Sequence, residues 1–193
     1  RGNKIVLDTY EKVLKGVHNH RWRIEHAQMV ADEDVDRFLN NGIIPAMQPS
    51  HCTSDARWLK ERIGSHRLHR ISRLKTFLKK GLKIPGGSDC PIETGDPIWE
   101  IHSAITRKDV SGKPVNGWQP QERIDALSAL KMFTSWAAYG AFDENKRGEI
   151  TPGFDADFTL LSQDITSIPS DEILNTKILM TMIGGNVIWV NTK

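Results

Sequence analysis

Short apolar runs alternate with segments of helical periodicity over residues 1–146, and this alternation constrains the fold more than any other feature of the sequence. Three of the runs are short enough to be strands, while the longer segments between them place apolar side chains on one face. Helices that connect consecutive strands bring those strands into a parallel sheet, so an α/β fold is expected. The expected strands cover residues 21–25, 43–47 and 82–87, and the expected helices cover residues 3–15, 32–40, 58–63, 72–80, 98–106 and 123–139.

The pattern changes after residue 146, where β-rich runs replace the helical segments. A strand is predicted at residues 158–161. The run KILMTMIGGNVIWV at residues 177–190 is typical of a β-hairpin, because two glycines and an asparagine separate its apolar halves. We therefore expect two parts, residues 1–146 and residues 147–193. Three strands neither close a barrel nor complete a doubly wound sheet, and the chain lacks a starting methionine, so we expect it to be part of a longer protein.

Polar side chains follow each of the three expected strands. His26 comes directly after the first strand, His51 follows the second, and Asp89 follows the third. The carboxyl ends of parallel strands share one edge of the sheet, and active sites of α/β proteins lie there, so these side chains are expected on one rim. An imidazole and a carboxylate are common ligands of a divalent cation, which makes this rim a candidate metal site.

Each of these residues also has an ordinary structural interpretation. His26 could be a polar histidine without a ligand, since the chain has seven histidines. Asp89 could be a metal ligand, a general base or the cap of a turn that begins at Ser88. His18 and His20 lie two residues apart, but they fall in the polar link before the first strand and are expected to be structural or exposed.

The positive charge is concentrated in one window of the chain. Ten of the 26 lysines and arginines lie between Arg57 and Lys83, together with a single acid, Glu61. Such a block can bind nucleic acid or phosphate. Residues 71–80, however, place apolar side chains at helical spacing between the charges, and the stacking aromatics of single-strand binders are not interleaved with them. We therefore expect the exposed face of an amphipathic helix and no nucleic-acid partner.

The length of the apolar runs, the cysteine count and the missing motifs limit the class of protein. No apolar run approaches the roughly 18 residues of a membrane-spanning helix, so no membrane association is expected. Cys52 and Cys90 are too few for a disulfide scaffold, and their spacing matches no structural zinc motif. Free thiols in a reducing compartment are the simpler interpretation, which favours a cytoplasmic protein. Nucleophile-elbow, phosphate-loop and dinucleotide-binding motifs do not occur.

Four motifs, in their order along the chain, resemble the metal-dependent hydrolases of amidohydrolase family 3. They are RIEHAQ at residues 23–28, PAMQPSH at 45–51, GGSDCPIE at 86–93 and GEITPGFDADFTLLS at 148–162. The resemblance covers nearly the whole chain, and the order and spacing of the motifs make it specific. It implies a TIM-type (β/α)8 barrel, of which this chain supplies strands six to eight, together with the returning strands of a small β-sandwich.

The resemblance also implies roles for the polar residues of the rim. His26 matches a metal-binding histidine at the end of strand six, Asp89 matches the strand-eight aspartate that binds metal and moves the proton, and His51 matches a histidine that faces the substrate. The implied reaction is hydrolysis of a non-peptide carbon–nitrogen bond in a small molecule, with water activated on one or two divalent metal ions, typically Zn²⁺. The family's ligands on strands one, four and five are absent, so the chain alone is expected to bind metal weakly and to be inactive.

Two further interpretations stay open at this point. Some relatives in the family are labelled regulators of exoenzyme production, so a non-catalytic regulatory protein of the same fold is the alternative function. The chain could also be a folding remnant that pairs with the missing half of the barrel. Apolar surface on its open sheet would then promote homo-oligomers.

Overall fold

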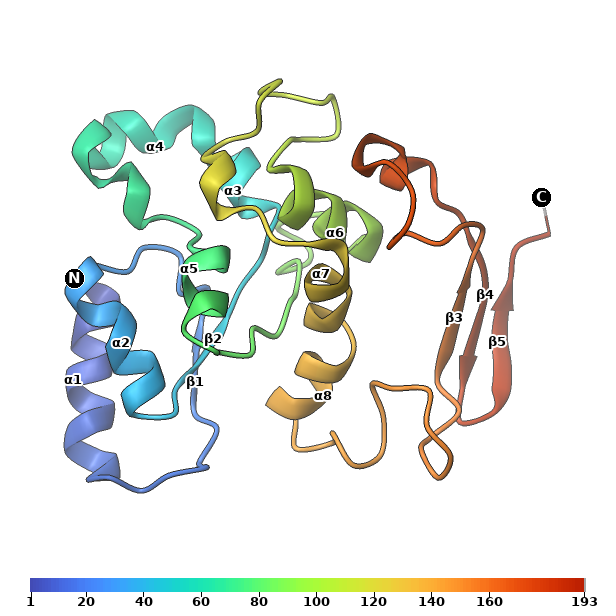
Figure 1. Ribbon diagram of the computed structural model, residues 1–193, viewed down its shortest axis with the longest axis horizontal. Helices are drawn as coiled ribbons and strands as arrows, with labels where there is room; N and C mark the ends of the chain where they lie inside the picture. The colour runs from blue at the N-terminus through green and yellow to red at the C-terminus, as the bar shows by residue number, and fades with distance from the viewer. Residues whose placement is uncertain (193) are drawn as a thin grey trace.

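The computed structural model describes residues 1–192 of the chain. Helices and a two-stranded parallel sheet make up the first part, and a three-stranded antiparallel sheet forms the C-terminal end (Figure 1). The two N-terminal helices lie at one end of the molecule, and the antiparallel sheet lies at the opposite end (Figure 1). The α/β fold predicted from the alternating pattern is confirmed.

The element bounds are as follows. The helices are α1 (Gly2–Leu14), α2 (Asp32–Asn40), α3 (His51–Ser54), α4 (Ala56–Ile63), α5 (Leu74–Lys79), α6 (Pro97–Thr106), α7 (Ala126–Met132) and α8 (Ser135–Gly140). The short 3-10 helices are η1 (Ser65–Arg70), η2 (Pro120–Glu122) and η3 (Ser170–Asn175). The strands are β1 (Arg23–Glu25), β2 (Ile44–Ala46), β3 (Phe158–Leu161), β4 (Ile178–Ile183) and β5 (Asn186–Val190).

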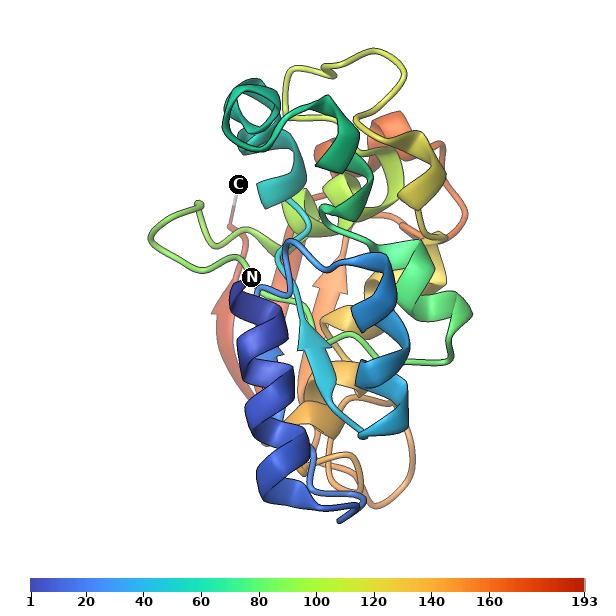
Figure 2. The ribbon, with the colours of Figure 1, turned by 90° about the vertical axis from the view of Figure 1, so that its left-hand side faces the viewer.

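Strands β1 and β2 form the parallel pair that positions the candidate site. Their register is Arg23 with Ile44, Ile24 with Pro45 and Glu25 with Ala46. All three residues of β2 are buried, whereas β1 buries only Ile24 and exposes its two charged residues. Helix α2 connects the two strands, and Figure 2 shows it lying alongside α1. The parallel pairing that the helical connection predicts is therefore confirmed.

The third expected strand, residues 82–87, is wrong as a strand. The segment runs beside β2 but pairs with it at one point only, in a parallel bridge between Met47 and Gly86. Pro85 has no N–H group with which to extend a ladder. The backbone nitrogens that face Met47 belong to residues 85 and 87, and Gly87 donates to the carbonyl of Met47 at 3.2 Å. The N–H of Gly86 points to the other side and donates to the carbonyl of Met132 at 2.8 Å. The ladder with β2 therefore stops at Pro85.

The continuous helix expected over residues 123–139 is also wrong, because it divides into α7 and α8. The break lies at Thr134, whose φ of −129° and ψ of −102° leave the helical region. Just before it, the carbonyl of Met132 accepts from Gly86, and the ring of Phe133 packs against the same glycine. Contact with the segment from residues 82–87 thus competes with continuation of the helix.

Smaller differences concern the connections. No helix was expected in the sequence QPSHCTSD at residues 48–55, but it contains α3. The helix expected at residues 72–80 is shorter and begins at Leu74, because Ser72 adopts a left-handed backbone with a φ of 49°. Part of the basic window is neutralised by α2. Its Asp32 lies 2.8 Å from Arg73, and its Asp36 lies 2.6 Å from Lys80.

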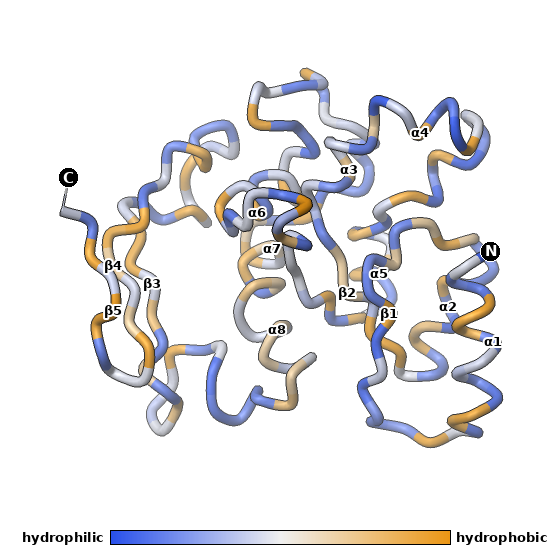
Figure 3. The backbone as a smooth tube through the Cα atoms, turned by 180° about the vertical axis from the view of Figure 1, so that it is seen from behind, coloured by the Kyte–Doolittle hydropathy of each residue, from blue (hydrophilic) through white to orange (hydrophobic). Residues whose placement is uncertain are grey.

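The C-terminal sheet has the order β3-β4-β5, with both pairs antiparallel. The turn between β4 and β5 consists of Gly184 and Gly185, whose φ values of 55° and 78° favour glycine. The strand expected at residues 158–161 and the hairpin expected at residues 177–190 are confirmed. All five residues of β5 are exposed, and the strand carries a run of apolar residues that Figure 3 shows in orange.

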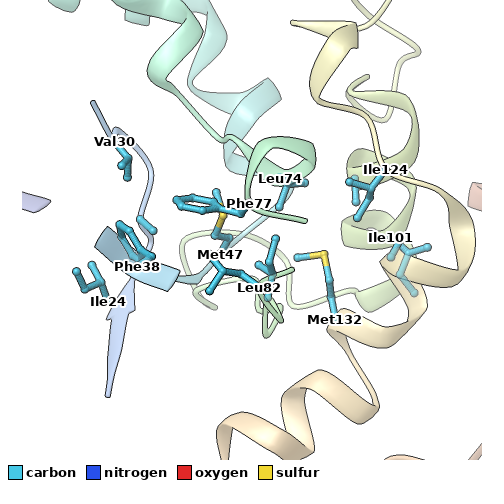
Figure 4. Packing of buried hydrophobic residues seen from close by; sticks show 14 of the residues in the cluster. Ile24, Val30, Phe38, Met47, Leu74, Phe77, Leu82, Ile101, Ile124 and Met132 are labelled. Carbon is cyan, nitrogen blue, oxygen red and sulfur yellow. The ribbon is translucent and has the colours of Figure 1, made fainter. Parts of the chain in front are cut away.

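One buried apolar cluster joins the elements of the α/β part (Figure 4). Phe38 from α2 and Phe77 from α5 are fully buried, and their ring centroids lie 5.0 Å apart in an edge-to-face arrangement. Met47 and Met132 extend the cluster toward α6 and α7. Burial on this scale is the main favourable term in folding, so this cluster holds the strand ends in place. Among residues 1–192, none of the helices combines the length and the apolar character of a membrane span.

Replacing Gly86 with alanine is expected to lower the free energy of unfolding by about 1–3 kcal/mol. A Cβ at this position would lie 2.7 Å from Cζ of Phe133, so the ring or the backbone must move. Gly87→Ala is the matched control, because its Cβ would have only Gln48 nearby, at 4.0 Å. Denaturant unfolding measures both variants, and adding Phe133→Leu to Gly86→Ala should restore part of the loss. Equal stability of the two alanine variants would contradict the close packing at Gly86.

Candidate metal centre

His26 lies just beyond β1, where the chain leaves the sheet. Its backbone is left-handed, with a φ of 66°, and the next residue, Ala27, has a φ of 38°. Residues other than glycine, asparagine and aspartate rarely adopt this region, and strained backbone of this kind clusters at functional sites. The imidazole side chain of His26 is 48% exposed and points toward Asp89.

Asp89 follows the segment that runs beside β2, and it also has a left-handed backbone, with a φ of 58°. Its carbonyl accepts from the N–H of Ile92 at 2.8 Å, which closes a turn. Its carboxylate Oδ2 lies 4.0 Å from Nε2 of His26. Two zinc–ligand bonds of about 2.1 Å can together span about 4.2 Å, so one cation fits between these two atoms.

His51 is the first residue of α3 and joins the other two residues at the rim. It is 8% exposed, and its ring is stacked on that of His26, with centroids 5.9 Å apart and an interplanar angle of 15°. Its Nε2 atom is buried and has no hydrogen-bond partner among the described residues. A buried polar nitrogen without a partner is unusual, so His51 has an unused donor or acceptor at this site.

A side-chain hydrogen bond cross-links the two histidine-bearing segments. Gln28, two residues after His26, donates from Nε2 to the carboxylate of Asp55 at the end of α3. The carbonyl of Gln28 in turn accepts from the N–H of Ser72 at 2.8 Å. The first contact ties the segment after β1 to the end of α3, and the second ties it to the start of α5. The sequence shows Gln28 and Asp55 27 positions apart and gives no sign that they meet.

Glu100 lies beneath the start of α3 and was not identified from the sequence. It is 1% exposed, and its carboxylate accepts from the N–H and the hydroxyl of Ser50, at 2.8 and 2.6 Å. Burial raises the pKa of Glu100 to about 7, while the hydrogen bonds from Ser50 oppose that rise. The one signal that could have revealed it is a lone carboxylate inside the otherwise apolar run PIWEI.

Among residues 1–192, the other histidines and the cysteines add no third metal ligand to this rim. His20 is held by the backbone, with Nε2 at 2.7 Å from the carbonyl of Asn41, and His18 is exposed, as expected for both. Cys52 and Cys90 are free thiols, and burial raises the pKa of Cys52. Within residues 1–192, no group of three or more histidine, cysteine, aspartate or glutamate side chains is arranged to hold a metal ion. The pair His26 and Asp89 therefore fits a cation in chemistry and spacing but does not complete a coordination shell.

An imidazole and a carboxylate within reach of one cation lie at the carboxyl ends of β1 and of the segment at residues 82–87, which both run parallel to the β2 segment between them, and such a site is suited to metal-assisted hydrolysis. The model of the amidohydrolase family matches residues 4–189. The chain belongs to this family, which confirms the resemblance seen in its four motifs.

Three curated relatives and one solved structure show how this chain relates to whole proteins. The putative amidohydrolase YtcJ of Bacillus subtilis (strain 168) is 33% identical over 186 residues, which cover 93% of this chain and 35% of YtcJ. Protein LONG AFTER FAR-RED 3 of Arabidopsis thaliana is 33% identical over 192 residues, covering 98% and 32%. N-substituted formamide deformylase of Arthrobacter pascens is 25% identical over 183 residues, covering 94% and 33%.

The crystal structure of an uncharacterised metal-dependent hydrolase from Pyrococcus horikoshii OT3 is similar in fold, with a TM-score of 0.74 and 27% sequence identity. The match covers 86% of this chain and 33% of that one. The chain thus spans about a third of the length of the curated relatives and of this structure.

Proposed function

We propose that this chain is the C-terminal portion of a metal-dependent amidohydrolase that cleaves a non-peptide carbon–nitrogen bond in a small molecule. The observation that carries the proposal is the 4.0 Å separation of His26 Nε2 and Asp89 Oδ2, with the ring of His51 stacked alongside. In this proposal residues 1–146 form strands six to eight of a TIM-type barrel, and residues 147–193 belong to a small β-sandwich.

His26 and Asp89 are the proposed metal ligands, and Zn²⁺ suits them best because it accepts both imidazole and carboxylate. When bound, such an ion supplies water with a pKa near 7 and an electrophile for the scissile carbonyl. Asp89 is also the proposed catalytic base: its second carboxylate oxygen can hold the proton of the attacking water and deliver it to the leaving nitrogen.

His51 is the proposed substrate-binding residue. Its Nε2 atom has no partner in the described structure, so it can accept from or donate to a polar group of the substrate. The ring is buried and stacked on His26, which keeps it next to the proposed ion while excluding water from one side. Loss of the proposed hydrogen bond between His51 and the substrate should weaken substrate binding more than it weakens metal binding.

The proposed site is incomplete in this chain. A catalytic zinc ion usually takes three ligands from the protein, and His26 and Asp89 are two. We propose that the remaining ligands, for one ion or two, come from other strands of a longer protein, as the one-third coverage of the relatives suggests. The chain alone should therefore bind metal weakly and turn over no substrate. The free thiols are in keeping with a cytoplasmic protein.

The proposal is tested on the intact protein that contains this chain. N-substituted formamides are the first substrates to try, since a relative with 25% identity is named for their deformylation, and simple N-acyl amines follow. We expect hydrolysis that a chelator abolishes and Zn²⁺ restores, and that Asp89→Asn reduces by a factor of about 100 or more, as loss of an acid–base group typically does. Activity that survives both the chelator and Asp89→Asn would contradict the proposal. No observation favours the regulatory alternative, but a regulatory effect that persists without metal would support it.

A further inference from the structure

The buried carboxylate of Glu100 is the least expected polar group near the rim. It lies in α6, whose neighbouring residues Ile98 and Ile101 belong to the apolar cluster, and it is 1% exposed. The described structure gives it no basic partner, and its two hydrogen bonds both come from Ser50. Burying a carboxylate without a cation is costly, so this side chain is not an ordinary part of a packed core.

The two hydrogen bonds hold both the backbone and the side chain of Ser50. One comes from its backbone N–H, at 2.8 Å, and the other from its hydroxyl, at 2.6 Å. Two hydrogen bonds to the same carboxyl group give a geometric specificity that a single bond lacks. With its N–H and its hydroxyl both held by Glu100, Ser50 is anchored directly before His51.

The residue that follows Ser50 is His51, and its ring makes no hydrogen bond with any of residues 1–192. Nε2 of His51 has no partner in the described part of the chain, so the direction of the imidazole depends on its backbone and on stacking against His26. Helix α3 is only four residues long, and its N-cap residue, Ser50, does not cap the helix N–H groups with its side chain, because its hydroxyl donates to Glu100.

We infer that Glu100 is a positioning residue of the site: by clamping Ser50 it holds the imidazole of His51 against His26 and within reach of a substrate at Asp89. The geometric part of this inference stands on the contacts described above, and its importance for catalysis rests on the proposed function. The simpler interpretation is that Glu100 only satisfies a buried N–H group and has no influence on the ring.

A matched pair of uncharged variants separates the two interpretations. In Glu100→Gln the amide oxygen can accept from the N–H of Ser50, and the amide N–H can donate to its hydroxyl oxygen, so the clamp survives without the charge. In Glu100→Met the volume is nearly kept, but both hydrogen bonds are lost. If Glu100 positions His51, only the methionine variant should move the imidazole. If Glu100 only satisfies the N–H of Ser50, neither variant should move it.

The measurement is the histidine ring region of the ¹H–¹³C NMR spectrum of the chain, assigned by single His→Gln variants. In Glu100→Met we expect the cross-peaks of His51 and of its stacking partner His26 to shift or broaden more than those of the exposed His18, His66 and His69. In Glu100→Gln we expect all of these cross-peaks to stay near their wild-type positions. Unmoved His51 and His26 signals in Glu100→Met, or equal movement in both variants, would overturn the inference.

Thermal unfolding of each variant shows whether it is folded at the temperature of the spectrum. If Glu100→Met does not fold, Ser50→Ala takes its place, because it removes only the hydroxyl bond and keeps the N–H bond. We then expect a smaller movement of the same two signals, and no movement would overturn the inference. A negative hydrolysis assay on the intact protein would overturn the proposed function without altering this spectrum, so the two failures are distinguishable.

Discussion

Replacing Phe77 with alanine is expected to lower the free energy of unfolding by about 3–5 kcal/mol, the largest effect of any single truncation that we predict. Phe77 is fully buried, and its ring lies edge to face with that of Phe38, with centroids 5.0 Å apart. The substitution removes the transfer free energy of the ring and leaves a cavity that the helices α2 and α5 cannot close. A domain of this size is stable by only about 5–15 kcal/mol, so the loss is a large share of the total.

Denaturant unfolding measures this loss, and Phe142→Ala is its matched control. Phe142 is 59% exposed, and the guanidinium of Arg21 lies over its ring, with Cζ 4.6 Å from the ring centroid. We expect the control to cost less than about 1 kcal/mol, the value of one exposed cation–π contact. Similar losses in the two variants would show that the Phe38–Phe77 contact does not lie at the centre of the core.

The second large effect concerns the pH dependence of stability through Glu100. Burial raises the pKa of this carboxyl from its ordinary value of 4.5 to about 7, and the charges of Glu93 and Asp96 act in the same direction. As the pH rises through this range, the unfolded chain loses its proton first and the folded chain keeps it. The contribution of Glu100 to stability is therefore fully present below pH 4.5 and is lost as the pH rises toward 7.

We expect the wild type to lose about 3 kcal/mol of stability relative to Glu100→Gln between pH 4 and pH 8, since each pKa unit corresponds to 1.36 kcal/mol. The glutamine variant cannot titrate at this position, and the remaining groups are common to both proteins, so their effects largely cancel in the difference. Denaturant unfolding at several pH values measures it. A difference that is independent of pH, or that favours the wild type as the pH rises, would contradict a raised pKa.

The sequence predicted the rim of the site better than it predicted the sheet that carries it. His26, His51 and Asp89 were identified because each follows an expected strand, and the structure brings all three together. The third of those strands did not form, because its pairing is limited to one bridge and Pro85 has no N–H to extend it. The local pattern of apolar residues shows where the chain is extended. It does not determine which distant carbonyl accepts a hydrogen bond from a given N–H group.

The same limit explains what was missed elsewhere. The apolar spacing over residues 123–139 is compatible with one helix, and only the contact between Phe133 and Gly86 shows why it divides. The contact of Glu100 with Ser50 joins residues 50 positions apart. Such long-range polar contacts depend on how α6 packs, which no single-sequence pattern specifies. The C-terminal hairpin, by contrast, was predicted correctly because its turn residues and its apolar runs are adjacent in sequence.

The most direct test of the proposed metal centre is a calorimetric Zn²⁺ titration of this chain and three variants. His26→Asn and Asp89→Asn each remove one proposed ligand, and His18→Asn removes an exposed histidine outside the site. We expect weak binding by the wild type, a loss of affinity of about tenfold or more in the first two variants, and no change in the third. Equal binding by all four proteins would contradict the assignment of His26 and Asp89, and a tight stoichiometric site in the wild type would contradict the incomplete coordination shell.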